Sequence, residues 1–144
     1  MYRIGIDLGG TNIVAGVVDD QYNIIATAKC KTNLPRPAEE IIADMARMAR
    51  EAAANAHLSM DDISMVGVGC PGTCNGDTGI VEYSNNLRFE QVPLKAILSD
   101  MLQKPVFVDN DANAAALGEY VAGAAKGVSS AVCVTLGTGV GGGV

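Results

Sequence analysis

The sequence lacks the features that mark membrane proteins and nucleic-acid-binding proteins. No apolar run approaches the roughly 20 residues that a membrane-spanning helix needs. The formal net charge is −6, and the ten lysines and arginines form no block. Nucleic acids and anionic membranes both require clustered positive charge, so we expect neither as a partner. Arg3 and Asp7 fall within a strand-like start, which predicts no signal peptide and a cytoplasmic protein.

The four cysteines also lack a recognisable metal or redox motif. Cys30, Cys70 and Cys133 fall in or at the ends of apolar runs, where cysteine usually acts as a small hydrophobic residue. Cys70 and Cys74 form a C-x3-C pair, which is neither the redox C-x-x-C nor a zinc-binding spacing. We interpret all four as structural, with a metal or redox role as the alternative.

What the sequence does contain is an alternation of apolar strands and amphipathic helices, which is typical of an α/β protein. Three strands come first and are separated by short turns, so a mixed sheet should begin with antiparallel hairpin strands and be flanked by helices. We expect strands at residues 2–7, 13–18, 23–31, 63–69, 105–108 and 131–136, helices at 38–57, 93–103 and 112–125, and a turn-rich loop at 70–79.

Two segments resemble each other. IGIDLGGTNIVAGVV near the start and VCVTLGTGVGGGV at the end both read as an apolar strand, Leu-Gly, small residues and a return strand. The second copy stops within its return strand. We therefore expect the front portion of a longer two-domain protein, with an amino-terminal α/β domain over residues 1–122 and the start of a second domain over 123–144.

The first glycine turn suits a phosphate group. Gly9 and Gly10 leave backbone N–H groups unobstructed, because neither residue has a Cβ, and Thr11 and Asn12 add side-chain donors. Asp7 at the strand end could hold Mg²⁺ through water, since magnesium keeps part of its hydration shell. The alternative is a tight hairpin whose glycines serve only the turn.

The second glycine turn contains a misleading pattern. Gly137, Gly139 and Gly142 match G-x-G-x-x-G, the pattern of a dinucleotide site. Such a site requires a helix to begin at the third glycine, and the run GGGV is a poor helix start. No Gly-Lys-Ser or Gly-Lys-Thr follows either turn, so a Walker-type loop is excluded. Two strand-turn-strand loops remain, and together they could grip a polyphosphate from opposite sides.

A third group of polar residues follows the strand at 105–108. Asp109, Asn110 and Asp111 fall at its carboxyl end, where open α/β sheets bind ligands. Either carboxylate could accept a proton from a substrate hydroxyl, and Asn110 could hydrogen-bond a neighbouring one. The same residue types are also ordinary helix N-caps, and these two interpretations weigh equally.

Two further polar positions have more ordinary interpretations. The segment YSNNLRF at 83–89 contains two asparagines, which suit polyol recognition and equally suit turns. His57 follows an amphipathic helix and is expected to be a surface residue rather than a catalytic one.

Taken together, the motifs resemble the ROK family of sugar kinases and repressors, and most closely its bacterial glucokinases. The resemblance covers nearly the whole chain and rests on IDLGGTN, GVGCPG, NNLRFEQVPL, PVFVDNDANAAALGEY and VTLGTGVGGGV, in matching order and spacing. It implies the actin-like ATPase fold, which is also described as ribonuclease-H-like, with ATP and a sugar bound in a cleft between two domains.

The resemblance also implies roles for individual residues. Asp111 matches the catalytic base that deprotonates the 6-hydroxyl of the sugar. The resemblance thus assigns the base to Asp111 and not to Asp109. Asn110 and Asn86 match sugar contacts, and Gly72 borders the sugar. The first phosphate loop comprises Asp7, Gly9, Gly10, Thr11 and Asn12, and the second comprises Gly137, Thr138 and Gly139.

The implied activity is the ATP- and Mg²⁺-dependent phosphorylation of a hexose, glucose first, by a homodimer. The family's second domain supplies a glutamate–histidine sugar motif and a cysteine-rich zinc site; neither is found in these residues, so we expect the chain alone to be inactive. Phe89 lies near a position where the family usually has tryptophan. The alternatives are a sugar-sensing repressor, disfavoured because no basic helix precedes the first strand, and another actin-like ATPase.

Overall fold

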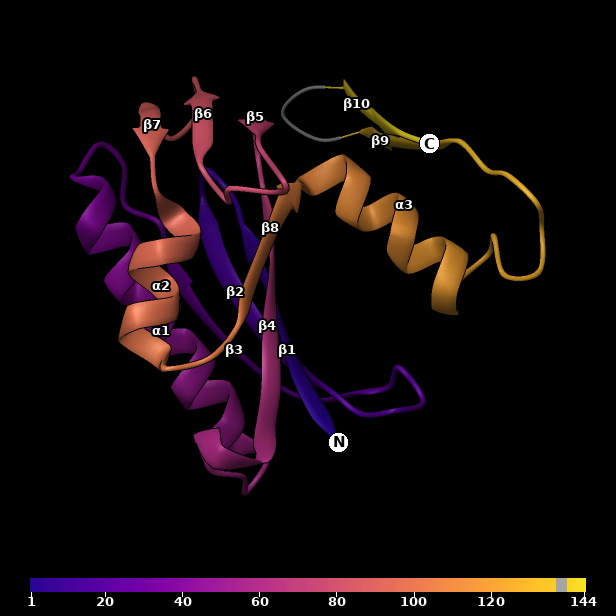
Figure 1. Cartoon of the computed structure of the whole chain (residues 1–144), viewed down its shortest axis with the longest axis horizontal. Helices are drawn as coiled ribbons and strands as arrows, with labels where there is room; N and C mark the ends of the chain where they lie inside the picture. Colours follow the sequence, from indigo (N-terminus) through magenta and orange to yellow (C-terminus); the bar gives the residue numbers. More distant parts are fainter. Residues whose placement is uncertain (137–139) are drawn as a thin grey trace.

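A mixed five-stranded sheet forms the centre of the computed structural model, which describes residues 1–136 and 140–144 (Figure 1). Its strand order is β3-β2-β1-β4-β8. The first three strands pair antiparallel, whereas β4 and β8 run parallel to β1. The strands are β1 (Tyr2–Leu8), β2 (Asn12–Val18), β3 (Ile24–Lys31), β4 (Ile63–Cys70) and β8 (Val106–Asn110). The predicted mixed sheet with a leading antiparallel hairpin is therefore confirmed.

Two helices cover one face of this sheet. They are α1 (Ala38–Asn55) and α2 (Leu94–Leu102), both on the same side in Figure 1, while α3 (Asp111–Ala122) lies on the other side. Every second residue of β1 from Ile4 to Leu8 is buried, as the pleat of a strand requires when one face is covered. An apolar stripe along α1 is buried as well: Ile41, Met45, Met48 and Ala52. No helix of the described residues is long and apolar enough to span a membrane.

The end of α1 agrees with the interpretation of His57. This residue is exposed and adopts a left-handed backbone conformation, with φ of 59°. The N–H of Leu58 then donates back to the carbonyl of Ala53 at 2.9 Å, which closes the last turn of the helix. His57 therefore terminates α1 at the surface, as expected.

A second, three-stranded sheet corrects the predicted loop. Residues 70–79 contain β5 (Thr73–Cys74), which pairs antiparallel with β6 (Val81–Ser84); β6 in turn pairs antiparallel with β7 (Phe89–Val92). These strands have two to four residues each and an irregular register between β5 and β6. They are too short to show the apolar alternation by which longer strands are recognised. Their sheet lies near the carboxyl ends of β1, β4 and β8 (Figure 1).

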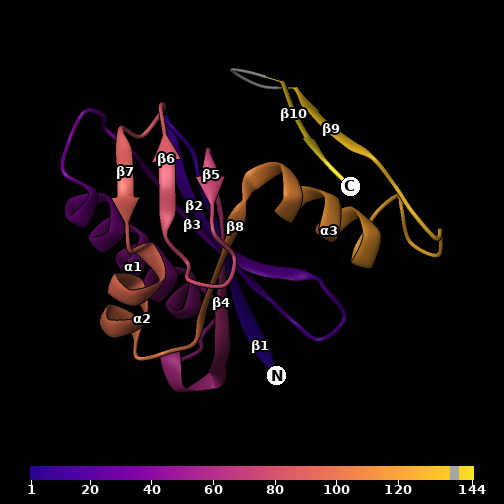
Figure 2. The ribbon, with the colours of Figure 1, turned by 45° about the horizontal axis from the view of Figure 1, so that its top comes forward.

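The carboxyl-terminal part of the chain contains a hairpin of β9 (Cys133–Leu136) and β10 (Val140–Gly143). The return strand suggested by the internal repeat is thus present. Figure 2 shows this hairpin beyond α3 and apart from the five-stranded sheet. The predicted extension of α3 to residue 125 was wrong, because the helix ends at Ala122, where Glu119 accepts a hydrogen bond from the N–H of Ala124.

An ion pair fixes the start of α1, and its removal gives a first prediction. The carboxylate of Asp44 pairs with Arg36 and Arg47, and the Arg36 and Asp44 side chains are about four-fifths buried, at 18% and 20% exposed. Burial acts to raise the pKa of Asp44, but the hydrogen bonds from Arg36 and Arg47 prevail and hold that pKa below 3.8. This stabilisation is complete above the ordinary pKa and is lost as the pH falls through the lowered value.

We therefore expect Asp44→Asn to lower the free energy of unfolding by about 2 kcal/mol at pH 7. The variant should also lose less stability than the wild type when the pH is lowered below about 4. Urea unfolding at pH 7 and pH 3 measures both effects. Equal acid sensitivity of the two proteins would contradict this account.

Candidate active site

The candidate site lies where three parallel strands end. Because β1, β4 and β8 are parallel, their carboxyl ends meet at one edge, and the register places Asp7 opposite Gly69 and Gly69 opposite Asp109. Alternation places these three residues on the sheet face opposite α1 and α2. A Cβ at Gly69 would lie 3.5 Å from the Cα of Asp111, so α3 begins directly over this row of residues.

The first glycine loop is held by hydrogen bonds of its own backbone and of a distant residue. The N–H of Gly9 donates to the carbonyl of Asn12 at 2.9 Å. The hydroxyl of Thr32 donates to the carbonyl of Gly9 at 2.6 Å, and the N–H of Thr32 donates to the carbonyl of Thr11 at 3.0 Å. Within the described part of the chain, the buried Oδ1 of Asn12 has no hydrogen-bond partner. The loop is therefore preorganised, and Oδ1 of Asn12 remains as a hydrogen-bond acceptor for a ligand.

Asp7 and Asp111 are close enough for their charges to interact. Packing of protein atoms around the Asp7 carboxyl raises its pKa above 3.8, and the negative charge of Asp111 raises that pKa further. A cation near the two carboxylates would offset both effects. Carboxylate oxygens with room for water suit Mg²⁺. Residues 1–136 and 140–144 contain no cluster of three or more metal-binding side chains, so a metal here would depend on water and substrate oxygens as well.

Asn110 caps α3, as one of its two interpretations predicted, and it also makes a contact that the sequence did not reveal. Its Oδ1 accepts from the N–H groups of Ala112 and Asn113, at 2.9 and 3.3 Å, and thus caps α3. Its Nδ2 donates to the carbonyl of Gly72 at 3.0 Å. Since an amide nitrogen carries two protons, one remains for a ligand. Both interpretations of Asn110, as a helix cap and as a ligand contact, are compatible with this geometry.

The two neighbouring aspartates differ in their contacts. Oδ1 of Asp109 accepts from the N–H of Asn110 at 2.6 Å and from Nδ2 of Asn113 at 3.1 Å. Oδ1 of Asp111 accepts from the N–H of Ala112 at 2.9 Å, and no other donor contacts Asp111 among the residues that the structure describes. Asp109 therefore stabilises the turn into α3, and Asp111 has more capacity left for a substrate.

Gly72 and Asn86 connect the small sheet to the site. Gly72 has a φ of +109°, and a Cβ there would lie 2.2 Å from the carbonyl oxygen of Tyr83, so a side chain has no room. Asn86 follows β6, and its Cβ would lie 3.8 Å from a Cβ at Gly10. The structure thus brings Asn86 to the first glycine loop and Gly72 to Asn110.

Sequence reasoning missed two residues around this site, Thr32 and Ser84. Ser84 is 1% exposed, and its hydroxyl has no partner among the described residues. No sequence signal pointed to Thr32, which lies 23 positions from Gly9. Cys70 is fully buried, in agreement with its structural interpretation. The nearby thiol of Cys74 and burial raise the pKa of the Cys70 thiol.

Gly137, Thr138 and Gly139, assigned to the second phosphate loop, lie outside the described residues.

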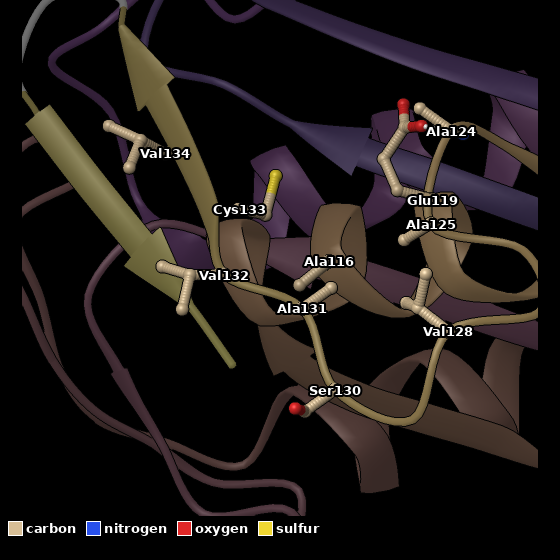
Figure 3. Close-up of a pocket in the computed structure, with 10 residues that line it drawn as sticks. All are labelled: Ala116, Glu119, Ala124, Ala125, Val128, Ser130, Ala131, Val132, Cys133 and Val134. Atoms are coloured by element: carbon tan, nitrogen blue, oxygen red, sulfur yellow. Dashed lines mark hydrogen bonds between the residues drawn. The ribbon is translucent and has the colours of Figure 1, made fainter.

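An open hollow of about 580 Å³ lies between α3 and the segment that follows it (Figure 3). Small and apolar side chains such as Ala116, Val128 and Val132 line it, and none of the proposed site residues does.

Comparison with known proteins supports the assignment of the fold. A glucokinase of Streptomyces coelicolor is 44% identical over 141 residues, which cover 98% of this chain and 42% of that protein. A solved ROK family glucokinase from Streptomyces griseus, in complex with glucose and AMPPNP, is 39% identical with a TM-score of 0.89 and covers 99% of this chain and 43% of that one. The predicted actin-like ATPase fold is thereby confirmed.

The relatives also include regulators. A putative xylose repressor of Caldicellulosiruptor sp. is 33% identical over 98% of this chain and 35% of that protein. The chain spans less than half the length of each of these relatives. The model of the ROK family matches residues 3–144, and this match over almost the whole sequence shows that the chain belongs to the ROK family.

Proposed function

We propose that the full-length protein transfers the terminal phosphoryl group of ATP to a hexose, glucose first, and yields ADP and the hexose 6-phosphate. The observation that carries the proposal is the convergence of a glycine loop, two carboxylates and two asparagines at one sheet edge. The similarity to glucokinases supports it. We also propose a cytoplasmic location, a homodimer, and the division into domains at residues 122 and 123.

In this mechanism Asp111 is the general base. It accepts the proton of the sugar 6-hydroxyl as that oxygen attacks the terminal phosphorus. Its position at the start of α3, with few competing hydrogen bonds, supports this role. Asn86 and the second side-chain amide proton of Asn110 orient the sugar hydroxyls, and the loop at Gly72 borders the sugar. Because phosphoryl transfer proceeds through a loose transition state, positioning and charge neutralisation provide most of the catalysis.

The first glycine loop binds the phosphates in this proposal. Gly9 and Gly10 present backbone N–H groups without Cβ atoms, and Thr11 and Asn12 add side chains. Asp7 would hold Mg²⁺ through water, and the metal would supply charge neutralisation of the phosphates. Gly137, Thr138 and Gly139 are proposed as the opposite loop on the basis of their sequence pattern alone.

Replacing Asp7 gives a test of the metal assignment. We expect Asp7→Asn to raise the Mg²⁺ concentration for half-maximal activity about tenfold, because a neutral amide attracts the hydrated cation less strongly. The KM for the hexose should not change. Magnesium titrations of the full-length protein measure the effect, with Asp77→Asn in an exposed turn as the control. An unchanged magnesium requirement would remove Asp7 from the metal site.

A coupled ADP-release assay over a panel of glucose, mannose, fructose and N-acetylated hexosamines tests the function. We expect glucose-dependent ADP release that requires ATP and Mg²⁺. The second candidate, a sugar-sensing repressor, is favoured by the similarity to the putative xylose repressor. A protein that binds sugar and shifts operator DNA in a gel, without releasing ADP, would favour that candidate.

A further inference from the structure

Thr32 is a buried polar residue for which the proposed mechanism has no role. It follows β3 directly, and its side chain is completely buried, with an exposure of 0%. In the β2–β3 pair, Asn12, the first residue of β2, lies opposite Lys31. Thr32 therefore lies beyond the start of β2 and alongside the first glycine loop. A buried hydroxyl requires hydrogen-bond partners, and Thr32 finds one within this loop.

The two bonds from Thr32 determine the orientation of two peptide groups. Its hydroxyl binds the carbonyl of Gly9 and its N–H binds the carbonyl of Thr11, at 2.6 and 3.0 Å. In a planar trans peptide the carbonyl and the next residue's N–H point in opposite directions. The N–H groups of Gly10 and Asn12 are therefore directed away from Thr32. Both N–H groups belong to the loop proposed to bind phosphate.

Thr32 is itself anchored to α1. Its carbonyl accepts a hydrogen bond from Nε of Arg36 at 2.8 Å. The Arg36 guanidinium pairs with Asp44, which lies on α1 and also binds Arg47. Because Arg36 and Asp44 are largely shielded from water, this connection is screened little. A continuous series of contacts thus runs from α1 through Arg36 and Thr32 to the glycine loop.

We propose that Thr32 is a positioning residue for nucleotide binding, which sets the first glycine loop so that the N–H groups of Gly10 and Asn12 face the phosphates. This inference rests on the proposed function, because it gives the loop a phosphate ligand. A purely structural Thr32 would affect stability without a selective effect on the nucleotide. The two roles can therefore be separated by experiment.

The test uses the full-length protein and two substitutions of Thr32. Thr32→Val keeps the volume but loses the donor to Gly9, and we expect it to weaken AMPPNP binding and raise the KM for ATP about tenfold each. The KM for glucose should change by less than about twofold, since neither bond of Thr32 to the loop involves Asn86 or Asn110. Thr32→Ser keeps the hydroxyl and should restore nucleotide binding to within about twofold of the wild type.

Ser64→Ala provides the matched control. Ser64 also donates its hydroxyl to a backbone carbonyl, that of Tyr2 at 3.0 Å, but at the opposite end of β1. Its removal should lower the melting temperature and leave nucleotide binding unchanged. Arg36→Gln leaves Thr32 intact and should weaken AMPPNP binding about threefold, so it carries the test if Thr32→Val does not fold.

Calorimetric titration with AMPPNP gives a readout that is independent of turnover. Unchanged AMPPNP affinity in Thr32→Val, or in Arg36→Gln where Thr32→Val does not fold, would overturn the inference. An equal loss of glucose and nucleotide affinity would also overturn it. Failure of the proposed function is seen separately, as wild-type protein that binds AMPPNP but phosphorylates no hexose. Wild-type protein that binds no AMPPNP would overturn both.

Discussion

Replacing Asp111 by asparagine should lower kcat by about a thousandfold, because an amide cannot accept the proton of the attacking hydroxyl. The KM for glucose should change by less than about threefold, since the variant keeps the shape and the hydrogen-bonding oxygen of the residue. Steady-state kinetics of the full-length protein measures both values. A near-normal kcat would remove Asp111 from the chemistry.

Asp109 provides the matched control for this experiment. It lies two positions away, carries the same group, and binds the N–H of Asn110 and the side chain of Asn113. Asparagine at position 109 can still accept these hydrogen bonds through its oxygen. We therefore expect Asp109→Asn to retain at least about a tenth of the wild-type kcat. If Asp109→Asn is the more damaging variant, the roles of the two aspartates are reversed.

Gly72→Ala should have the second largest effect, on stability and on the sugar together. The φ of +109° disfavours any side chain, and the new Cβ would lie 2.2 Å from the carbonyl oxygen of Tyr83. We expect the free energy of unfolding to fall by about 3 kcal/mol. The displaced Gly72 carbonyl would also lose its bond from Asn110. The KM for glucose should consequently rise about thirtyfold.

Gly76→Ala in the same loop is the control. A Cβ at Gly76 would lie 4.0 Å from its nearest neighbour, the carbonyl oxygen of Val108, so there is room for it. Urea unfolding and glucose kinetics should therefore give nearly wild-type values for this variant. Equal losses of stability and equal KM values for glucose in Gly72→Ala and Gly76→Ala would show that the positive φ and close packing at Gly72 do not determine either quantity.

The sheet and α1 could be predicted because their patterns are long. Four of the five strands have seven or eight residues, which is long enough to show a period of two, and the 18-residue α1 shows a period of three to four. The strands β5, β6 and β7 could not be recognised in this way, since each has at most four residues and pairs through turns. Their sheet is stabilised by tertiary contacts, which include the buried side chains of Leu87 and Phe89.

The candidate site was predictable in its members but not in its internal contacts. Motif reasoning selected Asp7, Asn110 and Asp111, and the parallel register brings the ends of their strands to one edge. That Asn110 holds both α3 and the carbonyl of Gly72 depends on a contact across 38 positions. Thr32 was missed for the same reason, because local sequence patterns carry no information on such distant contacts.

The choice between the two aspartates shows what each kind of reasoning contributes. Their chemistry in the sequence was equivalent, and only the family resemblance pointed to Asp111. The structure adds that Asp109 is engaged by the turn into α3, whereas the negative charge of Asp111 raises the pKa of Asp7. The base assignment stays a prediction, and the paired aspartate variants are designed to test it.

The central claim is that the loop at Gly9 and Gly10 and the base at Asp111 serve one reaction on ATP and a hexose. The most direct measurement is the joint quantification of ADP and glucose 6-phosphate by the full-length protein with ATP, Mg²⁺ and glucose. We predict one ADP for each glucose 6-phosphate, with both products lost together in Asp111→Asn. ADP release at the same rate without sugar, or no glucose 6-phosphate at all, would contradict the claim.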